Sequence, residues 1–182
     1  LLFAAQCASF LGDAIFMVAL AFAVLQVTGS AAALGTALAT GGALLVATFA
    51  VSGVWADRLP RVRLMVASDL VRFGSQGLLA VLLLTETAQL WHLLVLNGIH
   101  NVGMGFFQPA RTGLVPQLLQ PEQLVSSNGL MGVAESVVWT IGWAIGGVLV
   151  AAIGPGWAIA IDAATFAVST LLLLAIGRIP AP

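Results

Sequence analysis

Two acidic residues, Asp13 and Glu135, stand inside long apolar stretches of this chain. An ionisable side chain at membrane depth costs at least about 2.5–3.5 kcal/mol on insertion scales, so it usually faces a partner or a wet cavity. Removal of a carboxylate from water favours its protonated form, which is what a proton carrier needs. Gly12 precedes Asp13, with Ser9 and Gln6 one and two turns earlier. We predict that Asp13 and Glu135 exchange protons or hold a cationic or polar group of a substrate, with structural hydrogen bonding as the alternative.

Asp69 and Arg72 carry opposite charges and are three residues apart, which places them on one face of a helix. At 1.5 Å per residue they lie about 7 to 12 Å from the nearer end of their apolar segment. We predict that they form a structural ion-pair network near that end. By the same measure Asp162 lies about 7 Å from an end of the last apolar segment, and we expect a hydrated helix-end residue there.

Neither histidine has other metal-ligating residues near it in the sequence. His92 follows Trp91 at one end of an apolar segment, and His100 is expected to hydrogen-bond Asn97 or Asn101. The G-x-S-G nucleophile of an intramembrane serine protease is absent, and so is the H-E-x-x-H pattern of a zinc protease. We therefore expect no metal, no cofactor and no enzymatic activity.

The composition explains why charged residues are so informative in this chain. Of its 182 residues 60% are hydrophobic and only 7% are charged. Soluble domains carry about 25% charged residues, because they must present a polar surface to water. The net charge of −1 gives no basic surface for nucleic acid. The composition predicts a protein whose solvent is the lipid bilayer.

Turn-forming residues divide the chain into six apolar segments. A helix needs roughly 20 mainly apolar residues to cross a bilayer core. Strands of a membrane barrel would instead show alternating segments of about ten residues. The sequence therefore predicts an all-α membrane protein with six transmembrane helices, which together form one bundle. The predicted spans are residues 1–27, 31–55, 64–84, 90–107, 127–153 and 157–176.

The basic residues between these segments all fall on one side of the predicted bundle. They are Arg58, Arg61, Arg63, Arg111 and Arg178, whereas the connections 28–30, 85–89 and 153–156 contain no Lys or Arg. An excess of Arg in short loops marks the cytoplasmic face. We therefore expect both ends of the chain on the cytoplasmic side.

One of these connections carries a recognisable pattern. Residues 53–61, GVWADRLPR, resemble the G-x-L-a-D-R-x-G-R signature of the major facilitator superfamily, found between its second and third helices. Gly53, Asp57, Arg58 and Arg61 match it, while Pro60 replaces the second glycine. Other stretches, among them FFQPARTGLVPQLLQPEQLVSSNGL and IDAATFAVSTLLLL, resemble the enterobactin exporter-like and drug-efflux branch.

This resemblance implies the N-terminal six-helix half of a twelve-helix transporter, with the C-terminal half of the same chain as its partner. Such a protein exports drugs, siderophores or similar small molecules by alternating access across the bacterial plasma membrane, with protons as the coupling ion. The resemblance also implies that Asp57, with Arg58 and Arg61 as partners, latches the two halves on the cytoplasmic side.

The fifth segment keeps part of a further family pattern. Gly142, Gly146 and Gly147 match the glycines of the G-P-x-x-G-G motif of antiporters, but the proline is missing. Small residues between helices in lipid allow close backbone approach. The alternative to a half-transporter is a complete six-helix carrier or channel that works as a homodimer. The length of the reading frame beyond Pro182 distinguishes the two.

Overall fold

In a computed structural model, residues 2–118 and 120–176 are described, apart from the side chains of 57, 118, 121–125 and 176. These residues form helices joined by short connections, and none of them forms a strand. The helices are α1 (Leu2–Thr28), α2 (Ala31–Arg58), α3 (Arg61–Leu84), α4 (Leu90–Leu118) and α5 (Pro121–Ile176). The prediction of an all-helical chain is confirmed over these residues.

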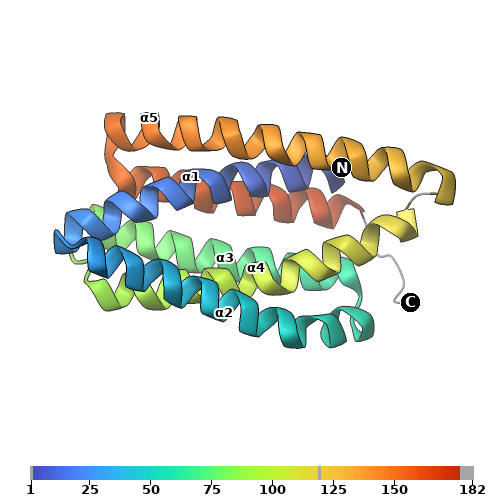
Figure 1. Ribbon diagram of the computed structural model, residues 1–182, viewed down its shortest axis with the longest axis horizontal. Coiled ribbons are helices and arrows are strands. Elements are labelled where there is room, and N and C mark those ends of the chain that lie inside the picture. Colours follow the sequence, from blue (N-terminus) through green and yellow to red (C-terminus); the bar gives the residue numbers. More distant parts are fainter. Residues whose placement is uncertain (1, 119, 177–182) are drawn as a thin grey trace.

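The described residues form five helices, whereas the sequence predicted six spans, because α5 contains the residues of the last two. Gly154 interrupts α5 with φ +82° and ψ 165°, a conformation that glycine adopts because it has no Cβ. Figure 1 shows that the chain reverses there, so that the arms 121–153 and 155–176 lie side by side.

Helix boundaries at the Arg-containing connections differ from the predicted ones, and α5 begins at Pro121 rather than at residue 127. The fourth span was expected to end near Phe107, yet α4 continues through Pro109 and Pro116 to Leu118. The helix continues because Phe107, Ala110 and Leu114 keep the helical spacing of buried apolar residues, each at most 1% exposed. The Arg-rich connection is also shorter than expected, since only residues 59 and 60 separate α2 from α3.

The helices pack in a defined order. α1 lies along α5, α2 lies along α4, and α3 contacts both α4 and α5. Figure 1 shows α1 and α5 in an upper layer and α2 and α4 in a lower one. α1 begins at the same end of the bundle at which α2 ends (Figure 1).

The interior of the bundle is divided along its length. One apolar cluster gathers around Phe16, Leu79 and Ile159, and a second, towards the end where α2 and α3 meet, around Met65 and Phe107. Between these clusters, four helices contribute buried polar residues. They are Gln6, Ser9 and Asp13 on α1, Ser68, Asp69, Arg72, Ser75 and Gln76 on α3, Asn97 and His100 on α4, and Asp162, Ser169 and Thr170 on α5. We call this set the polar layer.

The outer faces suit a lipid environment. Large apolar side chains such as Val46, Val148 and Leu171 are more than two-thirds exposed. Four helical stretches are long and apolar enough to cross a membrane: Leu2–Thr28, Ala31–Ala56, Arg61–Leu84 and, within α5, Ser126–Ala175. α4 falls outside this set although it has 29 residues. Its Asn97 and His100 lower its hydropathy, and both side chains are buried in the polar layer.

Candidate functional site: a buried charge cluster beside a cleft

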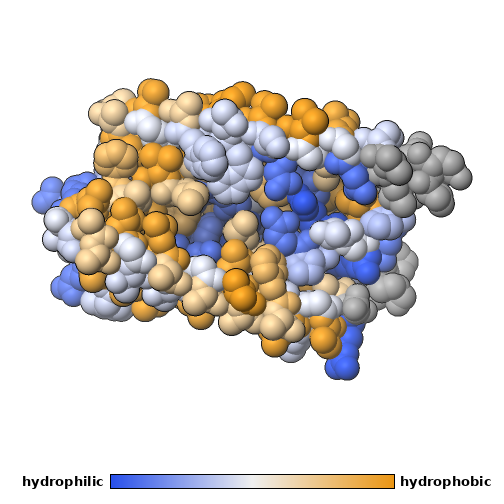
Figure 2. All heavy atoms as spheres, viewed as in Figure 1, coloured by the Kyte–Doolittle hydropathy of each residue, from blue (hydrophilic) through white to orange (hydrophobic). Residues whose placement is uncertain are grey.

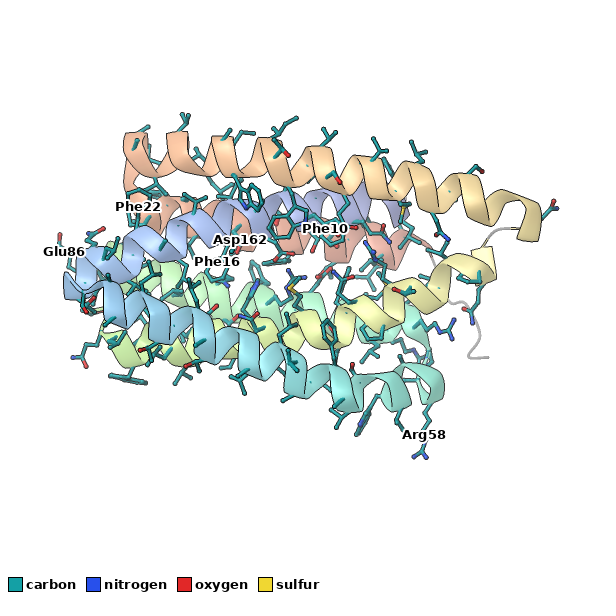
Figure 3. The ribbon with its side chains drawn as sticks, viewed as in Figure 1. Phe10, Phe16, Phe22, Arg58, Glu86 and Asp162 are labelled. Atoms are coloured by element: carbon teal, nitrogen blue, oxygen red, sulfur yellow. The ribbon has the colours of Figure 1, made fainter. Side chains whose placement is uncertain are left out.

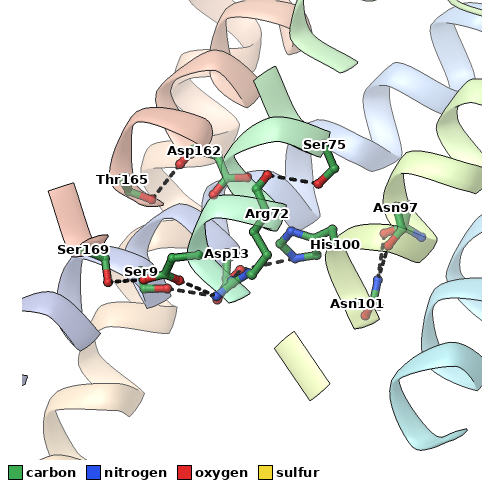
Figure 4. A network of polar contacts seen from close by, with 11 residues as sticks. Ser9, Asp13, Arg72, Ser75, Asn97, His100, Asn101, Asp162, Thr165 and Ser169 are labelled. Carbon is green, nitrogen blue, oxygen red and sulfur yellow. Dashed lines mark hydrogen bonds and ion pairs between the residues drawn. The ribbon is translucent and has the colours of Figure 1, made fainter. Parts of the chain in front are cut away.

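Arg72 is the centre of the polar layer. Its side chain is 1% exposed, and its guanidinium forms hydrogen bonds to residues of two helices (Figure 4). Nη2 donates to Oδ1 of Asp13, and Nη1 donates to Oγ of Ser9 at 3.1 Å and to Oδ1 of Asp69 at 3.4 Å. Arg72 and Asp69 therefore pair within α3, while Arg72 and Asp13 join α3 to α1. The sequence placed Asp13 and the Asp69–Arg72 pair in separate sites, whereas the structure brings all three together.

Asp69 is held from a second direction as well. Ser169 on the second arm of α5 donates a hydrogen bond of 2.6 Å to Oδ2 of Asp69. Both carboxylate oxygens of Asp69 thus accept from a donor, and the side chain is fully buried. Pairing and hydrogen bonding of this kind offset part of the cost of burying a carboxylate.

His100 closes the cluster from α4. Its Nε2 lies 3.4 Å from Oδ1 of Asp13, and its ring packs against Phe16 and Phe166 with centroids 4.6 and 5.8 Å away. The expected bond to Asn97 or Asn101 is not formed, because Asn97 donates to the Ala37 carbonyl and Asn101 donates to Asn97. The Phe166 ring also faces Arg72, whose Cζ lies 3.9 Å from the ring centroid. Such a cation–π contact stabilises a desolvated guanidinium.

Asp162 is the member of the cluster that sequence reasoning misplaced. It was expected to be hydrated, but it is fully buried, and neither of its oxygens has a hydrogen-bond partner among the described residues. The reason is that Gly154 starts the second arm, so Asp162 lies eight residues, about 12 Å, along it. A usable signal was present: Asp162, Thr165 and Ser169 follow the i, i+3, i+7 spacing of one helix face.

The cluster borders a cleft in the face of the bundle. The cleft has a volume of about 370 Å³ and is lined by Asp13, His100, Asn97 and Asn101, together with apolar side chains and Trp139. Figure 2 shows hydrophilic side chains along this central hollow, between the apolar surfaces of the upper and lower layers. Asp13 is only 4% exposed. Asp13 therefore lies at the boundary between the cleft and the buried charged residues.

Glu135 does not belong to this cluster. It lies on the first arm of α5, where one of its oxygens is 3.4 Å from Nη1 of Arg111 on α4. The two side chains are 34% and 18% exposed and line a separate hollow of about 290 Å³ with Thr112, Asn128 and Met131. Asp13 and Glu135, predicted as one kind of site, thus lie in two different environments.

The sequence as a whole was compared with known proteins. The family model of the Major Facilitator Superfamily matches residues 2–182. This chain belongs to the major facilitator superfamily. It is therefore an all-α, multi-pass membrane protein of a transporter family.

The curated relatives of this major facilitator chain include efflux proteins. Macrolide efflux protein A of Streptococcus pyogenes is 29% identical over 180 residues, which are 98% of this chain and 44% of that protein. Macrolide efflux protein A of Enterococcus faecalis is 27% identical over 128 residues, or 70% and 39%. The uncharacterized MFS-type transporter YfiS of Bacillus subtilis is 26% identical over 178 residues, or 97% and 42%. The chain spans less than half the length of these relatives.

The residues that match the superfamily's signature turn lie at the end of the bundle that carries the second apolar cluster. Arg61 at the start of α3 donates from Nη1 to the Gly113 carbonyl of α4, and so ties the two helices together. Arg58 is exposed and points away from the bundle at the end opposite to Glu86 (Figure 3). Gly53 is exposed. The Asp57 side chain lies outside the described part of the structure.

Of the three α5 glycines that match the family pattern, two meet another helix of this major facilitator bundle. A Cβ at Gly142 would lie 2.5 Å from Cβ of Ala14, and one at Gly146 would lie 3.1 Å from Cα of Ile15, both on α1. A Cβ at Gly147 would meet nothing within 4 Å. The glycines at 142 and 146 therefore let α5 approach the part of α1 that carries Asp13. Within residues 2–118 and 120–176 no set of three His, Cys, Asp or Glu could hold a metal ion.

Proposed function

We propose that this chain is the N-terminal six-span half of a secondary active exporter that moves small drug-like molecules or siderophores out of bacteria. The proposal rests on its membership of the superfamily and on relatives that are named macrolide efflux proteins. The Arg-rich end, with both termini, faces the cytoplasm of a bacterial plasma membrane. The cleft would complete the transport path with a C-terminal six-helix half of the same chain.

The observation that carries this proposal is the contact between Asp13, Arg72 and His100 at the floor of the cleft. A proton that reaches Asp13 through the cleft would neutralise its carboxylate and weaken its bond to Arg72. Because Arg72 joins α1 to α3, this step would alter the contact between two helices. An equilibrium between inward- and outward-open states shifts when a ligand favours one of them. Proton uptake at Asp13 would thus drive alternating access.

Two further groups are assigned roles in the same cycle. Glu135 would act as a second proton- or substrate-binding group, because it lines a hollow and its ion pair with Arg111 is solvent-accessible. Asp57, Arg58 and Arg61 would form the cytoplasmic latch against the C-terminal half. The tie from Arg61 to Gly113 supports this assignment, since it fixes the start of α3 at that end.

The test uses the full-length chain in a bacterial strain that lacks its main efflux pumps. We expect expression to lower accumulation of a macrolide, and we expect a protonophore to abolish that effect. Asp13→Asn should remove proton-driven efflux from everted vesicles but keep exchange of substrate down its own gradient. Export that persists at the wild-type rate with Asp13→Asn, or that is indifferent to the proton gradient, would contradict the proposal.

A further inference from the structure

The charges of the polar layer do not balance. One guanidinium, that of Arg72, faces three buried carboxylates, those of Asp13, Asp69 and Asp162, all at most 4% exposed. His100 is the remaining titratable group, and it touches Asp13 rather than Asp162. An ionised carboxylate without a counter-charge is very costly away from water. At least one of the three carboxylates must therefore carry a proton in this conformation.

The hydrogen bonds indicate which carboxylate that is. Asp13 accepts from Arg72 and contacts His100, and Asp69 accepts from Arg72 and Ser169. The backbone carbonyl of Asp162 accepts from Thr165. Its carboxyl group, by contrast, accepts from none of the described residues, although it lies within electrostatic reach of Asp13, Asp69 and Arg72 (Figure 4). Burial favours the neutral form of a carboxyl group, and this preference is strongest where no donor supports the charge.

The surroundings of Asp162 are also shaped to hold it close to α1. A Cβ at Gly12 would lie 2.5 Å from Oδ1 of Asp162, so the carboxyl group packs against the bare backbone of the residue before Asp13. Arg72 has one donor to spare, because its Nε has no acceptor among the described residues. The cluster therefore contains a buried acid without a partner and a guanidinium with an unused N–H.

From this geometry we propose that Asp162 is a further proton-binding site, in the same cluster as Asp13, and that Arg72 exchanges Asp13 for Asp162 as its partner during transport. In the state seen here, Asp162 is protonated and Asp13 is ionised and paired. In the other state, a proton taken up through the cleft has formed an O–H bond at Asp13, the O–H bond at Asp162 has broken with release of its proton to water on the opposite side of the membrane, and Arg72 has turned to Asp162. Each ionised carboxylate keeps a counter-charge, and the number of protons in the cluster does not change.

This inference rests on the proposed function for its role in transport, but the protonation of Asp162 can be tested without any substrate. Infrared spectra of the purified full-length transporter at neutral pH should contain the carbonyl band of a buried carboxylic acid. Asp162→Asn should remove that band, Asp162→Glu should shift it, and Glu86→Gln, in an exposed connection, should leave it unchanged. A band that survives Asp162→Asn, or a wild-type spectrum without one, would overturn the proposal.

Thermal unfolding of two matched variants provides a second test. Asparagine resembles a protonated aspartate in shape and charge, so Asp162→Asn should keep the wild-type melting temperature or raise it. Asp69→Asn should lower it, because both carboxylate oxygens of Asp69 accept hydrogen bonds, from Arg72 and Ser169, and asparagine has only one such oxygen. If Asp162→Asn unfolds the protein as Asp69→Asn does, the charged form of Asp162 is needed and the proposal is wrong.

Measurements of transport then distinguish a failure of this inference from a failure of the proposed function. If both hold, Asp162→Asn should lose proton-driven efflux and keep substrate exchange, as Asp13→Asn does. If Asp13→Asn abolishes proton-driven efflux while Asp162→Asn does not, proton coupling stands and the exchange of partners by Arg72 is refuted. If the full-length chain exports no macrolide, the proposed function fails for that substrate class, while the infrared band still decides the state of Asp162.

Discussion

The ion pairs of Arg72 and of Arg111 join similar groups, yet their surroundings differ in one decisive respect. Arg72 and Asp13 are 1% and 4% exposed, whereas Arg111 and Glu135 are 18% and 34% exposed. Water can replace either partner in the second pair and neither in the first. The comparison teaches that the depth at which a charged side chain is buried determines what it does in this bundle. The presence of an ion pair alone does not.

The largest effect is expected from removal of the central cation. Arg72→Gln leaves Asp13 and Asp69 buried without their counter-charge, and loss of one partner of a buried pair costs about 3–5 kcal/mol. We expect a large drop in the melting temperature of the purified full-length protein, or loss of folded protein from the membrane.

Two companion variants sharpen this result. Arg63→Gln, at an exposed position near the start of α3, should leave the melting temperature unchanged. The double variant Arg72→Gln/Asp13→Asn should be more stable than Arg72→Gln alone, because it removes one of the stranded charges. A double variant no better than the single one would show that Arg72 acts through packing on Phe166 and not through charge.

The next largest effect is expected at the contact between α1 and α5, close to Asp13. Gly142→Ala would set a methyl group 2.5 Å from Cβ of Ala14, so α1 and α5 must separate at a cost of about 1–3 kcal/mol. Gly147→Ala meets nothing and should be neutral, or stabilising by up to about 1 kcal/mol because alanine favours helix. Equal melting temperatures for the two variants would contradict the close approach of α1 and α5.

The sequence predicted what local spacing controls and missed what depends on contacts between helices. Asp69 and Arg72 are three residues apart, so their shared helix face follows from helical geometry alone. The bond from Ser169 to Asp69 spans 100 residues, and that from Arg72 to Asp13 spans 59. No periodicity within one segment reports which helices are neighbours, and so the three acids of the cluster were assigned to three separate places.

The boundaries of the helices could likewise not be predicted where they depend on contacts between helices. The apolar runs predicted the helical, membrane-spanning class of the chain, but the polar residues and prolines after Phe107 were read as the start of a connection. Burial against α3 keeps this stretch helical, since Ala110 and Leu114 are fully buried with Met65. Similarly, the depth of Asp162 could only be estimated from an uncertain helix start, which Gly154 fixes in the structure.

A smaller effect is expected at the tie between α3 and α4. A Cβ at Gly113 would lie 2.5 Å from Cζ of Arg61, which must then leave the Gly113 carbonyl. Because Arg61 is a flexible side chain, the helices need not move. The loss of one charged hydrogen bond, worth about 1.5–3 kcal/mol, is partly offset by alanine's helix preference, so we expect a net loss of about 1 kcal/mol for Gly113→Ala.

If Arg61 serves the proposed latch, Gly113→Ala should reduce efflux more than this change in stability explains. The measurement is the efflux rate of the full-length chain, normalised to folded protein. Gly129→Ala, on the first arm of α5 with nothing within 4 Å of its Cβ, is the control and should keep the wild-type rate. A normal rate for Gly113→Ala would place Arg61 outside the switching step.

The smallest effect on stability should come from the Arg111–Glu135 pair. Partly exposed ion pairs contribute about 0–1 kcal/mol, so Arg111→Gln should barely change the melting temperature, and high salt should erase even that difference. The same salt should not rescue Arg72→Gln, because its stranded carboxylates are shielded from ions. If Arg111→Gln instead proves as damaging as Arg72→Gln and insensitive to salt, depth does not separate the two regions, and the hollow beside Glu135 must be as dry as the polar layer.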